Sequence, residues 1–351
     1  MNANLVYINP ACRITRVRRL PAAGQVMVKN GQPVSTNEVI ASIDMPDKHL
    51  NLDVSRILGL DRAQAARAII PRPGDMIRKG EVIARRGGLL SKQLTSPVDG
   101  KVTDCSNARV LVELGSNPII VQAGFTGIVK EVIPGYGAIL VAEGAILQGV
   151  WGNGRLAEGL IISLVRNQVE ELNPDRMDVS LRGSVVFGGP CINAETMRLA
   201  ADIPLRGLIV SSIAPELLEL AEKLPFPVVA LIGLGKVPYD DHSYQIIGDL
   251  NKHVACINAV PWDRYSGLRP EVVVPRRGEG RITELPDNVE YTTGQLVRIL
   301  QSPYLWEIAR IKEIFPEARR YPSGIIADSA LCELANGKET VQPLVNLEVI
   351  L

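Results

Sequence analysis

The 351-residue chain has few aromatic, cysteine and histidine residues and no excess of charge of either sign. Phe, Trp and Tyr make up 4% of it, and 38 Lys and Arg balance 38 Asp and Glu. Its five cysteines lie far apart without a Cys-x-x-Cys pair, which argues against a disulfide framework or a zinc site. With three histidines, histidine-based metal chemistry is not expected either, and no cofactor or metal is assigned.

Long hydrophobic runs are also lacking. No stretch approaches the roughly 18 uninterrupted apolar residues of a membrane span, and the chain reaches Arg13, Arg16, Arg18 and Arg19 before any signal-peptide apolar region. A cytoplasmic protein without a membrane span is therefore expected. The length, with 46% hydrophobic residues, predicts two or three domains that each bury a core.

Two stretches in the first third repeat one pattern at identical spacing. Residues 31–41 read Gly-Gln-Pro-Val-Ser-Thr-Asn-Glu-Val-Ile-Ala, and residues 74–84 read Gly-Asp-Met-Ile-Arg-Lys-Gly-Glu-Val-Ile-Ala. A glycine followed by a valine two residues later recurs at Gly24, Gly100 and Gly127, where glycine suits tight turns or bulges between short strands. Two copies of one small β unit are predicted.

Between the two copies the pattern changes to helical spacing. Apolar residues between 52 and 69 fall near helical spacing, and Asp61 is the expected N-cap for the second half of this stretch. A helical insertion over about residues 50–70 is therefore predicted to interrupt the β module.

The repeat resembles the biotinyl/lipoyl-like barrel-sandwich hybrid, in which two quasi-symmetric halves close a flattened β structure. The likeness covers roughly residues 20–115 of a first domain at 1–118, and residues 96–102 look like the family's a-P-x-x-G-x-V segment. In carrier members a lysine at a hairpin tip is lipoylated or biotinylated, and Lys48 stands at the comparable place. Pro46, the following helix-like segment and the missing Met-Lys-Met depart from the carrier pattern. A structural or docking module is therefore favoured over a carrier.

Residues 119–180 continue as short strands separated by glycines and are assigned to an additional β module. From Gly183 onward, the apolar runs 184–187, 207–210 and 228–232 each lead into a helix-like segment. This alternation predicts a small parallel α/β domain over residues 181–275, with 254–257 as a fourth strand.

Ligands of such sheets bind at the carboxyl ends of the strands. Glycine turns there could offer N–H groups to a phosphate, with a lysine as counter-charge. Neither Gly-x-Gly-x-x-Gly nor a P-loop motif is present, so no nucleotide is assigned. The speculative ligand-binding residues at this edge are Gly188, Gly189, Ser211, Ser212, Gly233, Gly235 and Lys236.

Three other chemistries compete at the same edge. Cys191 could act as a nucleophile with His242 as its base, although a small buried thiol is the commoner reading. Asp240, Asp241 and His242 could bind a hard metal, although adjacent carboxylates more often cap a helix or form a solvated loop. A serine of the 211–212 pair could form a dyad with Lys236. None of these readings outweighs its structural alternative, so no catalytic residue is assigned.

A stretch rich in Pro, Gly and charge, residues 261–287, is expected to be an exposed connector. The alternations and turns that follow predict five short strands over residues 285–351. This segment resembles a KOW-type, SH3-like barrel, opened by Gly294-x-x-Val297-Arg298-Ile299 and closed by Val341-x-Pro343-Leu344-x-Asn346-Leu347-Glu348. The family's central glycine would fall near Ile308 or Ala309, which is a departure. The resemblance implies contact with RNA or with other proteins.

The sequence thus predicts an α+β multidomain protein whose order of modules resembles that of bacterial proteins with no assigned activity. The favoured function is a non-enzymatic scaffold or adaptor that docks protein partners or self-assembles through strand edges. One alternative is an α/β enzyme or sensor for a phosphorylated small molecule. The other is a KOW-type protein associated with RNA, the ribosome or transcription. The neutral charge disfavours it, because nucleic-acid binding needs a basic surface.

Overall fold

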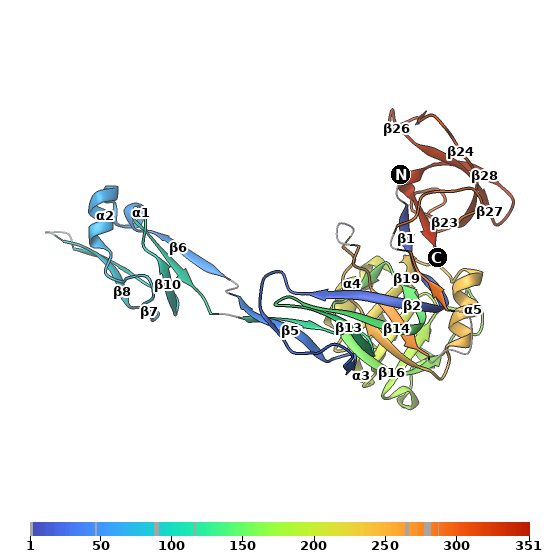
Figure 1. The fold of residues 1–351 in the computed structure, drawn as a ribbon, viewed down its shortest axis with the longest axis horizontal. Coiled ribbons are helices and arrows are strands. Elements are labelled where there is room, and N and C mark those ends of the chain that lie inside the picture. The colour runs from blue at the N-terminus through green and yellow to red at the C-terminus, as the bar shows by residue number, and fades with distance from the viewer. Residues whose placement is uncertain are drawn as a thin grey trace.

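The computed structural model describes residues 3–45, 48–87, 91–115, 117–263, 267–276, 282–286 and 288–351. Within these ranges the chain is mostly β and forms several sheets (Figure 1). We call residues 48–115 the distal module and residues 288–351 the C-terminal unit, and we call the remaining described residues the body. No helix of the described ranges is long and apolar enough to cross a bilayer.

The body contains a 12-stranded sheet, of which four neighbouring strands are parallel. The helical segments that follow them confirm the strand and helix alternation predicted from the apolar runs. The strands are β16 (Leu156–Ser163), β17 (Ser184–Gly188), β18 (Gly207–Ile213) and β19 (Val228–Leu234), and the helices are α3 (Ala194–Asp202), η3 (Pro215–Leu217), α4 (Leu218–Lys223) and α5 (Asp241–Asp249).

Helices cover both faces of this parallel part. Val185 and Phe187 of β17 belong to the core that contains Ile246 and Ile247 of α5. Val186 belongs to the core on the other face, with side chains of α3 and α4. Because both faces are buried, the strands read as continuous apolar runs rather than as alternating patterns. The 3₁₀ turns η1 (Pro174–Arg176) and η2 (Val179–Leu181) lie between β16 and β17.

The other half of the sheet is antiparallel. The strand predicted at residues 254–257 is present but runs antiparallel to β16, which is itself the fourth parallel strand. The antiparallel strands are β20 (Val254–Asn258), β21 (Glu271–Pro275), β14 (Gly137–Gln148), β13 (Gly127–Ile133), β4 (Pro33–Val34) and β2 (Ile8–Arg19). Short strands β15 (Trp151–Gly152) and β22 (Thr283–Glu284) pair with β19 and β2.

The expectation of an exposed connector over residues 261–287 is wrong at β21. This strand pairs with β14 on one side and β20 on the other, and Val272, Val273 and Val274 are buried. Three consecutive valines form a strand with both faces covered, and the surrounding Pro, Gly and charged residues concealed this short run.

The repeat corresponds to two copies of one β unit, and one copy is inserted into the other. In the first unit the strand order is β2-β14-β13-β4, and in the second it is β6-β11-β10-β7, with every pairing antiparallel. Each unit also has one further antiparallel strand pair, β5 with β12 in the first and β8 with β9 in the second. The added strands are β5 (Val39–Met45), β6 (His49–Asp53), β7 (Met76–Ile77), β8 (Val82–Arg86), β9 (Lys92–Thr95), β10 (Gly100–Asp104), β11 (Arg109–Glu113) and β12 (Asn117–Gln122), with β3 (Gln25–Val26) on β5.

Equivalent backbone hydrogen bonds show that the two units match. The Gly31 amide donates to the Val129 carbonyl at 2.8 Å, and the Gly74 amide donates to the Val102 carbonyl at 2.7 Å. Each copy of the repeat therefore pairs with its own later glycine segment. The expected arrangement, in which the two copies form the halves of one module over residues 20–115, is not the pairing observed.

The second unit, which is the distal module, is inserted between β5 and β12 of the first. Strands β5 and β12 pair along residues 39–45 and 117–122, and β6 and β11 pair beyond them. Lys48 lies where these two ladders meet, exposed, with its carbonyl accepting a hydrogen bond from Leu114 at 2.9 Å. The proposed carrier lysine is therefore part of a two-stranded ribbon between the modules and not of a hairpin tip.

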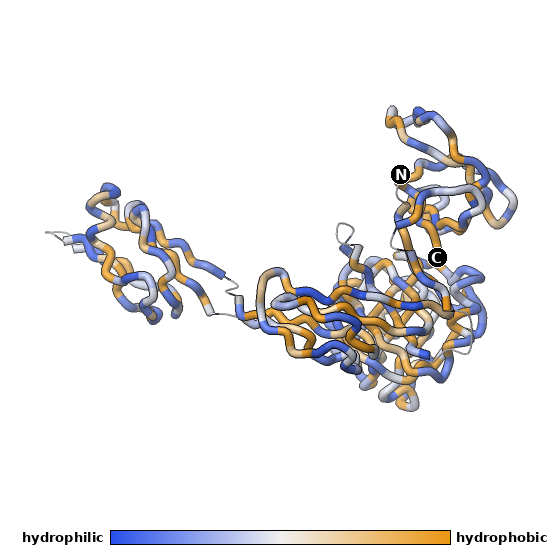
Figure 2. The backbone as a smooth tube through the Cα atoms, viewed as in Figure 1, coloured by the Kyte–Doolittle hydropathy of each residue, from blue (hydrophilic) through white to orange (hydrophobic). Residues whose placement is uncertain are grey.

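The predicted helical insertion is present in the distal module as α1 (Val54–Leu58) and α2 (Arg62–Ala68). Asp61 caps α2 as predicted, and Asp53 caps α1 in the same way, each accepting a bond from a first-turn amide. The helices and strands of the module enclose a hydrophobic core of their own. Figure 2 shows its apolar stretches inside the module, which stands at the end of the ribbon away from the body.

In the C-terminal unit the five predicted strands form one sheet, to which the start of the chain adds a sixth. The order is β1-β29-β23-β24-β27-β28, and β1 is parallel to β29. Among the described residues no pairing joins β28 to β1, so the sheet is open and not the closed barrel expected. The strands are β1 (Asn4–Val6), β23 (Leu296–Ile299), β24 (Ile308–Ile314), β27 (Ser329–Leu334), β28 (Glu339–Pro343) and β29 (Leu347–Ile350), with the hairpin β25 (Arg319–Arg320) and β26 (Ile326–Ala327) and the turn η4 (Leu344–Asn346).

We predict that Gly100→Ala loosens the distal module alone. A Cβ at this position would lie 2.4 Å from the Glu113 carbonyl oxygen, so β10 and β11 would have to separate, at a cost of roughly 1–3 kcal/mol. Hydrogen exchange of individual amides should show faster exchange over residues 76–113 and unchanged exchange in the body. Gly87→Ala is the control, because a Cβ there meets nothing within 4 Å. Equal effects of the two changes would contradict the prediction.

Candidate functional site

The residues predicted at the carboxyl edge of the parallel strands lie together, but their polar groups are already engaged. The Ser211 and Ser212 hydroxyls both donate to the Val237 carbonyl, at 2.8 and 2.9 Å, and both serines are buried. The Val237 amide in turn donates to the Ser212 hydroxyl at 2.9 Å. The two serines therefore fasten the loop after β19 and do not face a ligand.

The glycines of this edge serve close packing. A Cβ on Gly189 would lie 1.7 Å from the Glu170 carbonyl oxygen, and one on Gly188 would meet the Leu172 side chain. The Tyr239 hydroxyl donates to the Gly188 carbonyl at 2.8 Å. The loop before β17 thus covers the glycine turn, where an open phosphate cradle was expected.

The third loop is covered from the C-terminal unit. A Cβ on Gly233 would lie 2.7 Å from Nε1 of Trp306, whose ring packs over this glycine. Gly235 has φ +95 and donates its amide to the Ile213 carbonyl at 2.8 Å. Lys236 forms an ion pair with Glu171. The seven residues selected from the sequence are therefore brought together. Five of them are buried in packing contacts, whereas Gly235 is half-buried and Lys236 is exposed.

The contacts at this edge do not favour a cysteine nucleophile or a metal site either. Burial raises the pKa of the Cys191 thiol to about 12, which is opposite to what a nucleophile needs. Asp240 caps α5 by accepting from the Ser243 amide at 2.9 Å, and the His242 ring contacts the Ile8 carbonyl at 3.0 Å. Among the described residues no group of three His, Cys, Asp or Glu side chains could hold a metal ion.

A different site lies between the body and the C-terminal unit. Here a cavity of about 490 Å³ opens between the first two strands, the segment that leads into β21 and the end of the C-terminal unit. Its polar side chains include Arg16 and Arg18 of β2, Arg269, Glu271 of β21 and Glu348 of β29. Its size is within the range of small-molecule sites.

Glu271 holds two of these arginines. Its carboxylate accepts from Arg16 Nε at 2.9 Å and from Arg18 Nη2 at 3.2 Å, and only 4% of its side chain is exposed. Burial by itself would raise the pKa of Glu271, but the charges and hydrogen bonds of Arg16 and Arg18 outweigh it and lower the pKa. Arg18 also donates to the Ala123 carbonyl at 2.7 Å.

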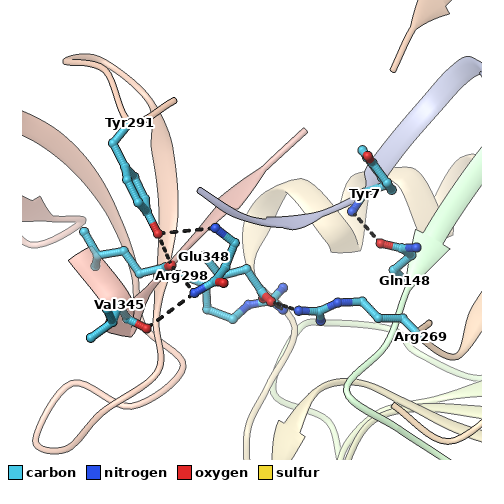
Figure 3. A network of polar contacts seen from close by, with 9 residues as sticks. Tyr7, Gln148, Arg269, Tyr291, Arg298, Val345 and Glu348 are labelled. Atoms are coloured by element: carbon cyan, nitrogen blue, oxygen red, sulfur yellow. Dashed lines mark hydrogen bonds and ion pairs between the residues drawn. The ribbon is translucent and has the colours of Figure 1, made fainter. Parts of the chain in front are cut away.

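Glu348 holds the other arginines from inside the C-terminal unit (Figure 3). It lies directly across the strand pair from Arg298, whose Nη1 is 3.3 Å from its carboxylate, and both side chains are fully buried. The other carboxylate oxygen is bound by Arg269 from the body. A single carboxylate therefore joins the two parts of the chain through charge-assisted hydrogen bonds.

This network has more positive than negative charge. Four arginines surround two glutamates, and buried guanidinium nitrogens of three arginines have no hydrogen-bond partner. Arg269 is 7% exposed, lines the cavity and leaves its Nη1 unpaired. Buried polar groups are normally satisfied, and an uncompensated buried charge is costly. The arrangement is therefore suited to an anion in the cavity.

Two aromatic rings flank the guanidinium groups. The Arg269 guanidinium lies 4.3 Å from the centre of the Trp262 ring, and that of Arg16 lies 5.7 Å from the centre of the Tyr7 ring. Both rings line the cavity together with apolar side chains, among them Leu5 and Leu300. Stacking fixes the planes of the guanidinium groups and adds an apolar wall on which an organic ligand could rest.

Sequence reasoning missed this site. The basic run of residues 13–19 gives no sign of an internal role, yet Arg16 and Arg18 point inward toward Glu271. A usable signal did exist, because Glu271, Arg298 and Glu348 are single charges inside apolar strand runs. Such residues are almost never fully buried unless they are paired.

Comparison with known proteins adds no further assignment. No family model matches the chain, and no curated protein matches it. The functional argument therefore depends on the geometry of the described residues.

We predict that Glu271 makes the stability of the protein dependent on acid pH. Because the pKa of Glu271 in the folded state lies below its ordinary value of 4.5, its ion pairs stabilise the fold above about pH 4.5. That contribution is lost as the pH falls through the folded-state pKa. In urea unfolding between about pH 5 and pH 3, the free energy of unfolding of the wild type should fall more steeply than that of Glu271→Gln.

At neutral pH the Glu271→Gln variant should be less stable by about 3 kcal/mol, because it leaves the buried Arg18 and the half-buried Arg16 uncompensated. Glu143→Gln serves as the matched control, since Glu143 pairs with Arg13 at an exposed position. Its loss should cost less than about 1 kcal/mol. Equal pH slopes for the wild type and Glu271→Gln would show that the carboxylate does not carry the effect.

Proposed function

We propose that this chain is a non-enzymatic, ligand-responsive adaptor that binds a small phosphorylated molecule between its body and its C-terminal unit. The observation that carries the proposal is the excess of arginine around one cavity, which Arg269 lines while its buried Nη1 has no hydrogen-bond partner. Among its described lining residues none is a His, Cys or Ser, so the lining favours binding over nucleophilic chemistry.

A phosphate group suits this cavity best. A guanidinium presents its N–H groups as a planar fork that matches the oxygens of a phosphate, and this preference is stronger for Arg than for Lys. A phosphate would offset the excess positive charge of the network, of which three arginines and two glutamates line the cavity. The organic part of the ligand would lie against Trp262 and Tyr7.

The position of the cavity supports an adaptor. Arg16 and Arg269 belong to the body, whereas Leu300, Val345 and Glu348 belong to the C-terminal unit. A ligand held by both parts would restrict their relative movement, and it would stabilise whichever arrangement it binds better. Binding would thus control how the chain presents its other surfaces.

A second hollow favours a protein partner or another copy of the chain. It has a volume of about 590 Å³ and lies beside β28, the last strand of the open sheet. Tyr321, Ile325, Val341 and Val345 line it, and Ile325 and Val345 are exposed by 63% and 55%. An open strand edge beside an apolar hollow suits an added peptide strand.

The two nested β units and the C-terminal sheet each suggest a relationship to a known fold. We infer that the two nested β units are related to the barrel-sandwich hybrid, with docking and not carrier activity. The six-stranded sheet of the C-terminal unit would be an opened relative of the KOW-type, SH3-like fold. The repeated glycine turns and the order of the five strands from β23 to β29 support these assignments.

We predict that pyrophosphate and a sugar phosphate raise the unfolding temperature of the protein, measured at constant ionic strength with chloride as the reference. Ligand at 100 times its Kd stabilises the folded state by about 2.7 kcal/mol. Arg269→Gln should lower the affinity at least tenfold by calorimetry, because it removes one of the three guanidinium groups that line the cavity.

Because Arg269→Gln could also weaken the fold, a second variant is needed. Thr15→Glu places a carboxylate at an exposed position on the cavity wall and should repel the same ligands without loss of the core. Thr292→Glu, exposed in the C-terminal unit, is the control. Unchanged phosphate binding in Thr15→Glu, or no stabilisation of the wild type by any phosphate, would overturn the proposal.

A further inference from the structure

The neutral chain conceals an uneven distribution of charge. Residues 48–115 contain twelve Lys and Arg against seven Asp and Glu, so the rest of the chain carries five more acidic than basic residues. All twelve basic side chains of the distal module are exposed. The distal module, which stands away from the body, therefore has a net positive charge, whereas the rest of the chain has a net negative one (Figure 1).

Most acidic side chains of this module accept hydrogen bonds from its backbone amides. Asp53 and Asp61 cap α1 and α2. Asp75 and Glu81 accept from the amides of residues 72 and 78, at 2.8 Å each, and Asp99 accepts from the Lys79 amide at 2.8 Å. Within the described part of the module a single ion pair forms, between Arg109 and Asp53 at 3.5 Å. The acidic groups therefore stabilise turns and helix ends and leave the basic side chains available.

The basic residues are densest at the outer end. This end is formed by α1, α2, β8 and β9, which pack on one another. Arg86 and Lys92 reach the carbonyls of Leu58 and Ile57 at the end of α1, at 3.3 and 2.7 Å. Within residues 54–70, 85–87 and 91–95 the single acidic residue is Asp61, and the basic residues are Arg56, Arg62, Arg67, Arg85, Arg86 and Lys92.

The outer end has a rigid support. The module has its own buried core, which includes Leu58 and Ala65 of the two helices and Ile83 and Leu94 of the hairpin. The side chains therefore project from packed elements, and their spacing is fixed before any partner arrives. A preorganised surface loses little conformational entropy on binding.

From this distribution we infer that the distal module binds the phosphate backbone of a nucleic-acid duplex. Eight of its twelve cations are arginines, which match phosphate oxygens, and phosphate contacts supply most of the non-specific affinity of duplex binders. Residues 48–115 contain no Phe, Trp or Tyr. Stacking on single-stranded bases and aromatic anchoring in a bilayer both need such rings, so a duplex is the polyanion that this surface fits.

The test measures binding of the full chain to DNA and RNA duplexes of about 30 base pairs by fluorescence anisotropy over a range of salt concentrations. Each phosphate contact contributes about 0.9 to the slope of log K against log salt. The double variant Arg62→Glu/Arg67→Glu should lower the affinity at least tenfold and reduce the slope by about 1 to 2. Arg85→Gln/Lys92→Gln, on the hairpin, should act in the same direction and guards against a local effect on α2.

The matched control is Arg182→Glu/Arg198→Glu, which makes the same charge change at exposed positions of the body and should leave binding unchanged. An equal loss in this control would mean that net charge alone is measured and would overturn the proposal. It would also be overturned by tighter binding to a single strand than to the duplex, or by binding to phosphatidylserine vesicles without duplex binding. None of these readouts depends on the arginine cavity.

Discussion

The contact on which the arrangement of the chain depends is the carboxylate of Glu348, which is shared between Arg298 of its own sheet and Arg269 of the body. A buried carboxylate is tolerated only when its oxygens are bound, so the C-terminal unit and the body each supply what the other requires. The same contact brings Arg269 beside Trp262 and positions the cavity next to Arg16 and Glu271. The ion pairs of Glu348 thus both join the two parts of the chain and form one side of the candidate site.

The first β unit, which is part of the body, and the distal module have the same arrangement of strands. In both units a four-stranded antiparallel sheet is accompanied by a further strand pair, and equivalent glycine amides donate to equivalent later carbonyls. In the second unit the pair β8–β9 is a hairpin, whereas in the first the pair β5–β12 continues into the ribbon. A repeat that looks like two halves in sequence can therefore be two whole units, one within the other.

The sequence predicted those strands and helices whose structure is determined by neighbouring residues in the chain. The apolar runs at 184–187 and 228–232 are strands, and Asp61 caps its helix, because burial on both faces and a first-turn hydrogen bond leave clear marks. The site was beyond the same reasoning. The residues next to Ser211 in the sequence do not reveal that its hydroxyl donates to the Val237 carbonyl. Those next to Arg16 do not reveal that it pairs with Glu271. These contacts are set by the order of strands in the sheet.

Nesting also fixes an order of events during synthesis. The distal module is one continuous segment, residues 48–115, and its strand pairings, up to that of β6 with β11, all fall within it. The first unit, by contrast, needs β13 and β14, which emerge from the ribosome after the whole module has been made. Short-range contacts form fastest, and domains fold as they emerge. The distal module can therefore fold before β13 and β14 of the first unit have been synthesised.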